Sequence, residues 1–240
     1  MEVVVCQTVS STNTLLKMCF RAKHIQAPLC IRAINQVQGR GQRSSTWSVD
    51  SGKNLTFSFL IEKKVSQSFV INMLVSKAIY NFLTTLKVPM LKIKWPNDIL
   101  SGSKKIGGVL IEHLLSSSSK TSHWVIGIGL NVNQTSFNTL PKANSLARVC
   151  GHSFNLETLL SDFLKHLEYT INAYTATDYS QLLKSYESFL FRRGKVSTFS
   201  KEHQTFLGII KGINSQGKLT VLLENDSLQE FDLKEIKLLY

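Results

Sequence analysis

The sequence predicts an α+β fold, in which a mixed sheet with flanking helices precedes a small C-terminal β-barrel. Two observations support this class. Up to about residue 190, segments with apolar residues at strand period alternate with segments at helical spacing. After residue 193 only short strand-like segments joined by Gly- or Asn-containing turns follow. We therefore expect two domains, residues 1–192 and residues 193–240.

The chain is expected to begin with a strand–turn–helix unit. Residues 3–9 are apolar and end at the polar residues 10–13, which are favoured at helix N-caps. The apolar residues of 15–20 then recur at helical spacing. Residues 29–36 are a second apolar strand. Residues 55–61 alternate apolar with polar or small side chains, which is typical of a half-buried strand.

The middle of the chain predicts one helix and three strands. Apolar residues at helical spacing over 71–86 indicate an amphipathic helix. Residues 91–95 form a strand that the following proline stops. Strands 106–115 and 124–132 flank the serine-rich run 116–120, which has the composition of an exposed hairpin tip.

The last third predicts two helices and the barrel. A helical apolar stripe over 156–167 follows Asn155, a favourable cap, and residues 179–190 suggest a final helix. The short strands of the barrel are expected at residues 196–199, 206–213, 218–224 and 228–232.

Composition limits the functional classes. The 240 residues carry a net charge of +12, which favours anionic partners such as a nucleotide, a nucleic acid or an acidic protein. The four cysteines have no CxxC spacing and are expected to be reduced, mostly buried thiols of a cytoplasmic protein. The histidines form no HxxxH or Cys/His cluster, so no zinc site is expected. No apolar run approaches the ~18 residues of a membrane span, and the N-terminus lacks the basic region of a signal peptide.

The segment QVQGRGQRSSTW, residues 36–47, has the composition of a ligand-binding loop. Gly39 and Gly41 let backbone N–H groups approach a ligand closely. Arginine binds carboxylate or phosphate oxygens two at a time, and Trp47 offers a face for stacking on a heterocycle. Such a loop favours an anionic ligand that carries a base. Taken alone, it is equally compatible with a solvated turn bearing two surface arginines.

Three polar clusters lie at the ends of expected strands. KWPND ends at Asp98, which the proline turns outward. In KKIGG, Lys105 opens an apolar strand and faces a cleft where it can meet an anion. In GIGLNVN, two glycines from Gly127 onward allow close approach, and Asn131 offers a donor and an acceptor. Each cluster alone is also compatible with an ordinary turn or strand edge. The chain contains neither a dinucleotide fingerprint nor a P-loop.

Together and in this order, the motifs Ser11-Thr12-Asn13, the GRG loop ending in Trp47, KWPND, KKIGG and GIGLNVN resemble the biotin protein ligases. The resemblance covers essentially all 240 residues. It implies a mixed-sheet α+β domain like that of class II aminoacyl-tRNA synthetases, with a C-terminal SH3-like β-barrel. The implied enzyme uses ATP to activate biotin as biotinyl-5′-AMP and transfers biotin to a lysine of a biotin carboxyl carrier protein. The implied protein is a cytoplasmic monomer or homodimer, with Mg²⁺ carried by ATP and no metal site of its own.

The resemblance also assigns roles to residues. Lys105, Arg40 and Asp98 are the implied catalytic residues, with the two cations neutralising the carboxylate and phosphates. The implied biotin-binding set is Ser11, Thr12, Asn13, Gln36, Gly39, Arg40, Gly41, Gln42, Lys105, Gly108, Gly127 and Gly129. The implied adenylate-binding set is Arg40, Arg43, Trp47, Lys105 and Asn131.

The chain departs from the family pattern in two respects. The bacterial loop often reads GRGRxGRxW, whereas Gln42, Ser44 and Ser45 stand here at positions of two arginines and a glycine. We therefore expect a weaker grip on the adenylate. About ten residues precede Ser11, too few for the N-terminal helix-turn-helix repressor module of many relatives, so no DNA-binding role is expected.

Two other classes of function are weighed. A lipoate–protein ligase shares the fold and the adenylation chemistry, but KWPND and GRG favour biotin. A non-catalytic biotin-responsive or RNA-binding protein needs Arg40 or Lys105 to be replaced, and both are present.

Overall fold

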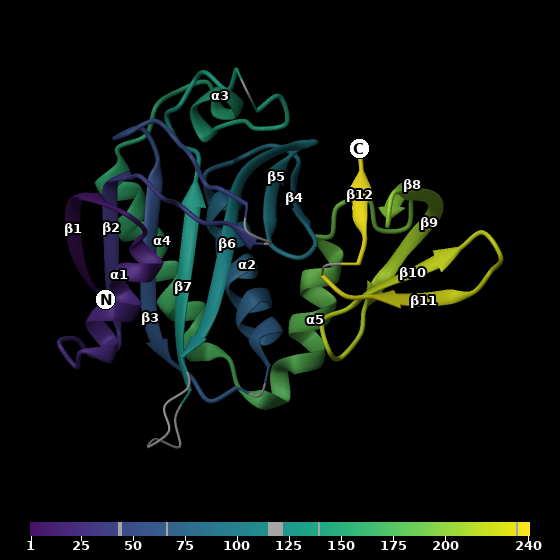
Figure 1. Ribbon diagram of the computed structural model, residues 1–240, viewed down its shortest axis with the longest axis horizontal. Coiled ribbons are helices and arrows are strands. Elements are labelled where there is room, and N and C mark those ends of the chain that lie inside the picture. Colours follow the sequence, from purple (N-terminus) through teal and green to yellow (C-terminus); the bar gives the residue numbers. More distant parts are fainter. Residues whose placement is uncertain (43–44, 66, 115–121, 139, 234) are drawn as a thin grey trace.

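The structure is a computed structural model that describes residues 1–42, 45–65, 67–114, 122–138, 140–233 and 235–240. Within these residues the chain forms one seven-stranded and one five-stranded sheet with helices packed around them (Figure 1). The strands of the large sheet are β1 (Glu2–Val9), β2 (Leu29–Gln36), β3 (Leu55–Glu62), β4 (Leu91–Lys94), β5 (Asp98–Ser101), β6 (Lys104–Leu114) and β7 (His123–Leu130). The helices are α1 (Thr12–Arg21), α2 (Ser68–Thr85), α3 (Leu146–Cys150), α4 (Leu156–Ala173), the 3-10 turn η2 (Ala176–Asp178) and α5 (Tyr179–Ser188).

The large sheet has the strand order β1-β2-β3-β7-β6-β5-β4. Strand β1 runs parallel to β2, and each following pair of described neighbours is antiparallel. Strands β3, β7 and β6 form its centre, with Ser58 opposite Gly127 and Thr56 opposite Gly129. Because cross-strand partners point to the same face, these four residues share one side of the sheet.

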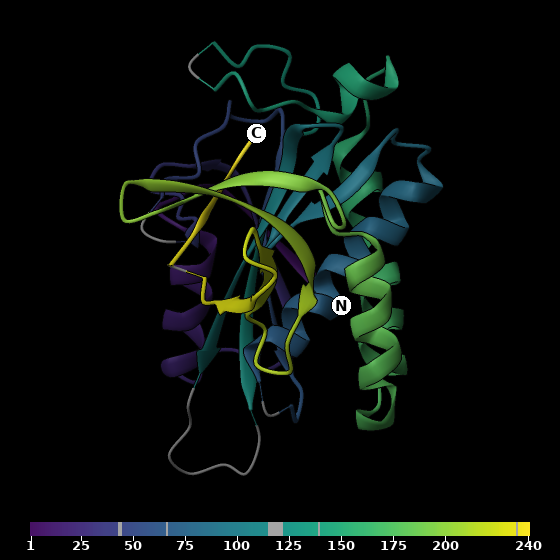
Figure 2. The same ribbon diagram turned by 90° about the vertical axis from the view of Figure 1, so that its right-hand side faces the viewer.

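Helices cover the sheet unequally on its two faces. The main core lies between one face and the helices α2, α4 and α5, and it is closed by large residues such as Phe57, Phe82 and Phe163. On the opposite face, α1 packs a smaller cluster around Leu16 and Val125. Figure 2 shows α1 and the pair α4 and α5 on opposite sides of the sheet. Helix α1 covers only part of its face, and the uncovered part carries the site described below.

Most elements expected from the sequence are confirmed within one to three residues at each boundary. Strand β2 and the start of α5 agree with the expected positions, and Asn155 caps α4 by accepting bonds from the backbone N–H of Glu157 and Thr158. Ser11 is the N-cap of α1, but its side chain makes no capping hydrogen bond. The expected hairpin tip at residues 116–120 lies outside the described residues.

Four elements were not expected, one of them the 3-10 turn η2. Strand β5 follows the proline turn directly, so residues 95–97 connect the two strands of a hairpin and Asp98 begins the second strand. The short helix α3 begins at a Ser145 cap, and β12 (Lys237–Leu239) pairs with β8 (Val196–Lys201). Helix α3 and β12 contain five and three residues, which is too short for a periodic sequence pattern.

The C-terminal sheet is open. Its order is β11-β10-β9-β8-β12, including β9 (Gln204–Ile213), β10 (Leu219–Leu223) and β11 (Leu228–Phe231). In the described part of the chain, the edge strands β11 and β12 do not pair, so the closed barrel expected from the sequence is not confirmed. The four strands that were expected are present, and the Asn214–Gly217 turn joins two of them.

The cysteines are free thiols, but the expectation that most are buried was wrong. Only Cys30 is buried, and its burial raises the pKa of the thiol to about 12. Cys6, Cys19 and Cys150 are half-buried: Cys6 lies on the edge strand β1, Cys19 in α1 and Cys150 at the end of α3. None of the described helices combines the length and apolar character needed to cross a membrane.

The α4 cap generates a stability prediction. Asn155→Ala removes the acceptor for two backbone N–H groups, so we expect the free energy of unfolding to fall by roughly 1 kcal/mol. Urea denaturation measures this loss. Gln181→Ala, at an exposed position of α5, is the control and should leave the midpoint unchanged or raise it slightly. An Asn155→Ala midpoint equal to wild type would contradict the capping role.

Candidate active site

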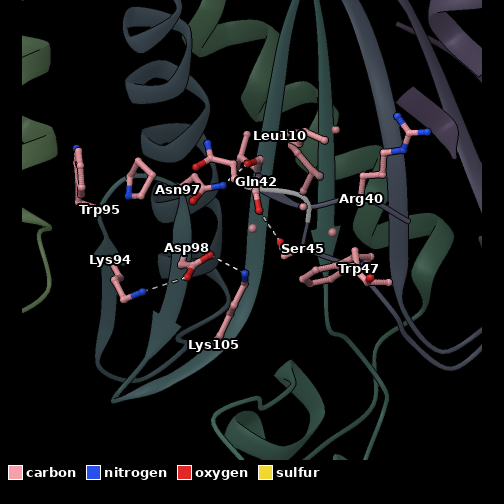
Figure 3. Close-up of a pocket in the computed structure, with 18 of the residues that line it drawn as sticks. Arg40, Gln42, Ser45, Trp47, Lys94, Trp95, Asn97, Asp98, Lys105 and Leu110 are labelled. Atoms are coloured by element: carbon pink, nitrogen blue, oxygen red, sulfur yellow. Dashed lines mark hydrogen bonds and ion pairs between the residues drawn. The ribbon is translucent and has the colours of Figure 1, made fainter. Parts of the chain in front are cut away.

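A cavity of about 230 Å³ opens over the face of the large sheet that α1 leaves uncovered (Figure 3). Thirteen of the residues predicted for the site line it, namely Ser11, Thr12, Asn13, Gln36, Arg40, Gly41, Gln42, Trp47, Asp98, Lys105, Gly108, Gly127 and Gly129. Two predicted residues, Gly39 and Asn131, lie nearby but are absent from the lining. Arg43 is outside the described residues.

The floor of the cavity is made by glycines of β7. A Cβ at Gly127 would lie 2.3 Å from the Asn13 side-chain oxygen, and one at Gly129 would lie 2.2 Å from the Trp47 ring. Both distances are far below van der Waals contact. These positions must therefore lack side chains for Asn13 and Trp47 to lie against the sheet.

One end of the cavity is a buried polar network. The backbone N–H of Thr12 donates to Gln36 Oε1 at 2.8 Å, and Thr12 Oγ1 lies 2.6 Å from Ser58 Oγ. Ser58 donates to Asn13 Oδ1 at 2.5 Å, and Asn13 Nδ2 donates to Glu112 Oε2 at 2.8 Å. The first residues of α1, Thr12 and Asn13, thus use their side chains to bond across the sheet.

The other end is charged. Asp98 Oδ1 lies 2.6 Å from Lys105 Nζ, and Asp98 Oδ2 lies 3.6 Å from Lys94 Nζ. The backbone of Lys105 is fixed by bonds with Lys142 and Asn144, so its ammonium is held at the cavity wall. Figure 3 shows Lys94 and Lys105 on either side of the Asp98 carboxylate. The side chain of Lys105 is 35% exposed, which leaves it accessible to an anionic ligand.

The turn that carries Asp98 is held from two helices. Pro96 O accepts hydrogen bonds from Asn72 Nδ2 of α2 at 2.6 Å and from the Tyr186 hydroxyl of α5 at 2.7 Å. Complete burial, together with the charge of Asp98, raises the pKa of Tyr186 and keeps its hydroxyl protonated as a donor. The side chain of Asn97 donates to Val109 O across the hairpin. Asp98 therefore projects from a rigid turn.

The glycine–arginine loop folds back on itself at the rim. Arg40 pairs with Thr46 in an isolated bridge, and Trp47 N donates to Gly39 O at 2.9 Å. This places the Trp47 ring 5.6 Å from Lys105 Nζ, with the indole N–H buried and without a hydrogen-bond partner among the described residues. Arg40 is exposed, and Figure 3 shows its guanidinium pointing away from Lys105 and Asp98.

Asn131 acts behind the cavity wall. Its side chain donates to Asn144 O at 2.9 Å, and its backbone bonds Ile106 and Leu146. It thereby fixes the segment that also bonds the backbone of Lys105. The Oδ1 atom of Asn131 is buried and has no hydrogen-bond partner among the described residues.

Sequence reasoning missed several residues of the site. Ser58 and Glu112 complete the polar network, and the register with Gly127 on β7 is the signal that points to Ser58. The C-terminal sheet was assigned no site residues, but it and the segments beside it contribute Phe191, Ile210, Leu219, Ile236, Lys237 and Leu238 to the lining. Within the described residues, no group of three or more His, Cys, Asp or Glu side chains is arranged to hold a metal ion.

Comparison with known proteins places this geometry in a family context. Residues 4–131 match the model of the "Biotin/lipoate A/B protein ligase family". The chain is 26% identical over 213 residues to the bifunctional ligase/repressor BirA of Bacillus subtilis, covering 86% of this chain and 65% of that protein. It is 26% identical over 223 residues to the biotin--[acetyl-CoA-carboxylase] ligase of Mycobacterium tuberculosis, covering 90% and 81%. The chain thus spans just under two thirds of the length of the first of these relatives.

The fold is also found among solved structures. The biotin protein ligase from Aquifex aeolicus in complex with biotin and ATP superposes with a TM-score of 0.83 at 23% identity, covering 99% of this chain and 98% of that one. The Leishmania major biotin protein ligase in complex with biotinyl-5-AMP gives a TM-score of 0.66 at 19% identity, covering 96% and 98%. These likenesses show that the mixed sheet with its flanking helices is a known architecture.

The β7 floor generates a prediction about Trp47. Gly129→Ala places a methyl group where the indole ring lies, so the ring must leave the sheet. In protein labelled with 5-fluorotryptophan, we expect the ¹⁹F resonance of Trp47, assigned with Trp47→Phe, to shift. Gly127→Ala is the matched control, because its methyl group meets Asn13 instead. A Trp47 resonance that is unchanged in Gly129→Ala would contradict the packing described here.

Proposed function

We propose that this chain, which belongs to the biotin/lipoate A/B protein ligase family, activates biotin with ATP and transfers it to a lysine of a biotin carboxyl carrier protein. One observation carries the proposal: a single cavity has Lys105 and Asp98 at one end and a buried amide and hydroxyl network at the other. The first end suits a carboxylate and a phosphate, and the second suits the ureido ring of biotin.

In the first step, a carboxylate oxygen of biotin attacks the α-phosphorus of ATP. The bond between that phosphorus and the β-phosphate bridging oxygen breaks, and pyrophosphate leaves with the Mg²⁺ that ATP carries. Two anions must approach each other, so the step depends on neutralising charge as the pentacovalent state forms. Lys105 is held at the cavity wall for this role. Arg40 is exposed, and it reaches the reacting anions when its loop rearranges.

In the second step, the amine of the carrier lysine attacks the acyl carbon of biotinyl-5′-AMP, an amide bond forms and AMP leaves. The attacking amine must lose a proton, and Asp98 is the carboxylate at this end of the cavity. Once Lys105 binds the anion, Asp98 is available to orient the amine and accept its proton. Most of the acceleration in both steps comes from positioning the reactants.

The proposal includes the remaining roles implied by the sequence. Trp47 packs against adenine, and Asn131 supports this subsite from behind the wall, where its Oδ1 has no hydrogen-bond partner within the described part of the chain. The division into residues 1–192 and 193–240, the latter a variant of an SH3-like barrel, is supported by the separate C-terminal sheet. The carrier as acceptor is supported by the relatives named as biotin--[acetyl-CoA-carboxylase] ligases. We also propose a cytoplasmic location, as a compartment that supplies both ATP and the carrier.

Lipoate is the alternative acid, because the matching family model includes lipoate ligases. The dithiolane ring of lipoate has no N–H donor and no carbonyl acceptor. It would offer no donor to the remaining lone pairs of the buried Thr12 and Asn13 oxygens, and a buried polar group left unsatisfied costs about 1–3 kcal/mol. This cost favours biotin.

The test is transfer of biotin to a purified carrier domain. We expect ATP-dependent labelling by wild type, and a loss of at least about 100-fold in Lys105→Ala, because one preorganised cation opposite the reacting anions is removed. Lys104→Ala is the matched control, since Lys104 is exposed and is not part of the lining.

Three other outcomes would contradict the proposal. Wild-type labelling by Lys105→Ala would refute the role of Lys105. Exchange of pyrophosphate into ATP with lipoate but not with biotin would show that lipoate is the substrate. Binding of RNA with steep salt dependence, together with no turnover, would show that the protein is an RNA-binding protein and not an enzyme.

The sequence of the loop generates a second prediction. Gln42 and Ser45 supply no positive charge at the cavity rim, so we expect biotinyl-5′-AMP to leave the enzyme faster than from relatives with arginine-rich loops. A chase of preformed enzyme–adenylate with unlabelled biotin and ATP measures the lifetime. Gln42→Arg should lengthen it about tenfold, the effect of one charge-assisted hydrogen bond. Retention for hours by wild type at neutral pH would count against this interpretation.

A further inference from the structure

We propose that Glu112 is a positioning residue that sets the donor and acceptor pattern of the acid-binding end of the cavity and so selects a cyclic urea. This inference rests on the proposed function, because it concerns the recognition of the acid. It starts from the geometry of Glu112, which lies on β6 where the sheet face passes from beneath α1 into the cavity.

The carboxylate of Glu112 is tied on both oxygens. Oε2 accepts from Asn13 Nδ2 at 2.8 Å, and Oε1 accepts from Lys17 Nζ of the same helix, α1. An ionised carboxylate has no proton to donate. The group of Asn13 that faces Glu112 must therefore be its NH₂, which removes the ambiguity between the two orientations of an amide.

The orientation of the Asn13 amide determines which atoms donate and which accept in the rest of the network. With its NH₂ on Glu112, Asn13 presents Oδ1 to Ser58, so the single proton of Ser58 goes to Asn13 at 2.5 Å. Ser58 Oγ then serves as the acceptor for Thr12 Oγ1 at 2.6 Å. Gln36 Oε1 lies 3.2 Å from Thr12 Oγ1 and is a second, more distant acceptor for the same proton. With either acceptor the Thr12 proton stays within the protein, so oxygen lone pairs of Thr12 and Asn13 remain to accept from a ligand.

The amide of Gln36 is oriented by Thr12 rather than by Glu112. The backbone N–H of Thr12 binds Gln36 Oε1, so Gln36 Nε2 is the group left to donate. The cavity thus pairs acceptors on α1 with a donor on β2. A cyclic urea, which carries N–H groups beside a carbonyl oxygen, matches this pattern, whereas a ring with only carbon and sulfur does not.

Glu112 is half-buried beside Asn13 and is not part of the cavity lining, so it acts through its neighbour. Glu112→Gln keeps the size of the side chain but can donate as well as accept. The Asn13 amide is then free to take either orientation, and the order of protons from Ser58 to Thr12 is no longer defined. Recognition of the urea should weaken while the charged end of the cavity is unchanged.

The experiment is pyrophosphate exchange with biotin or lipoic acid as the acid, on purified full-length protein. In Glu112→Gln we expect the KM for biotin to rise roughly 10- to 100-fold, as for loss of a hydrogen bond to a charged group. The kcat at saturating biotin and the KM for ATP should stay within about twofold of wild type. The preference for biotin over lipoic acid should fall by the same factor by which the KM for biotin rises.

Two further variants keep the test decisive. Ser58→Ala breaks the network beyond Glu112 without changing a charge, and we expect the same biotin-specific rise in KM, roughly 3- to 10-fold. Glu62→Gln is the matched control, because Glu62 ends β3, is half exposed and faces His123 rather than the cavity. It should behave as wild type.

The outcomes separate the two proposals. A wild-type enzyme that exchanges pyrophosphate with biotin, together with an unchanged biotin KM in Glu112→Gln and Ser58→Ala, overturns the inference alone. A parallel rise of the KM for biotin and ATP with a lower melting temperature shows a structural role and also overturns it. A wild-type enzyme that does not exchange with biotin overturns the proposed function and the inference with it.

Discussion

The site depends on one constraint, the absence of side chains at two alternate positions of β7. Gly127 and Gly129 point to the same face of the sheet as Ser58 and Thr56 on the neighbouring strand. Further along that face larger residues such as Val125 resume, and α1 packs on them. A side chain at either glycine would fill the space now taken by Asn13 or Trp47. The face is thus divided into a packed half and a hollow half, and all the polar and charged groups of the site are arranged around the hollow.

The two ends of the hollow differ in how firmly their groups are held. The amide and hydroxyl network is buried, so each member must keep its partner or bear a desolvation cost, and its geometry is fixed before a ligand arrives. The Asp98–Lys105 pair is partly exposed, and such pairs contribute little to stability. Lys105 can therefore exchange Asp98 for a ligand anion at small cost. For the two-step acyl transfer that we propose, a rigid end suits recognition of the acid and a charge pair that can rearrange suits the reacting phosphate.

The sequence predicted much of the fold and most of the cavity lining because both leave local patterns. Alternation and helical spacing located the long elements, and the clusters GRG, KWPND, KKIGG and GIGLNVN contributed residues that line the cavity. The features that were missed become visible only from strand register and from contacts between residues far apart in the sequence. Ser58 and Glu112 look like ordinary strand residues until β3, β7 and β6 are paired. Helix α3 and β12 are too short for periodicity, and whether the C-terminal sheet closes depends on pairing between its edge strands, which no local pattern shows.

The C-terminal part of the chain also shapes the site, through the turn that carries Asp98. Trp95 donates from its indole N–H to Gly217 O of the C-terminal sheet at 3.1 Å, one residue before the Pro96 carbonyl that Tyr186 holds. The next residue of α5, Glu187, accepts from the backbone N–H of Ile213 at 2.8 Å and so ties the helix to β9. A shift of the C-terminal sheet must therefore move α5, the proline turn and the Asp98 carboxylate together. The family match ends at residue 131, so these hydrogen bonds connect a site built largely from motifs before that residue to segments after it.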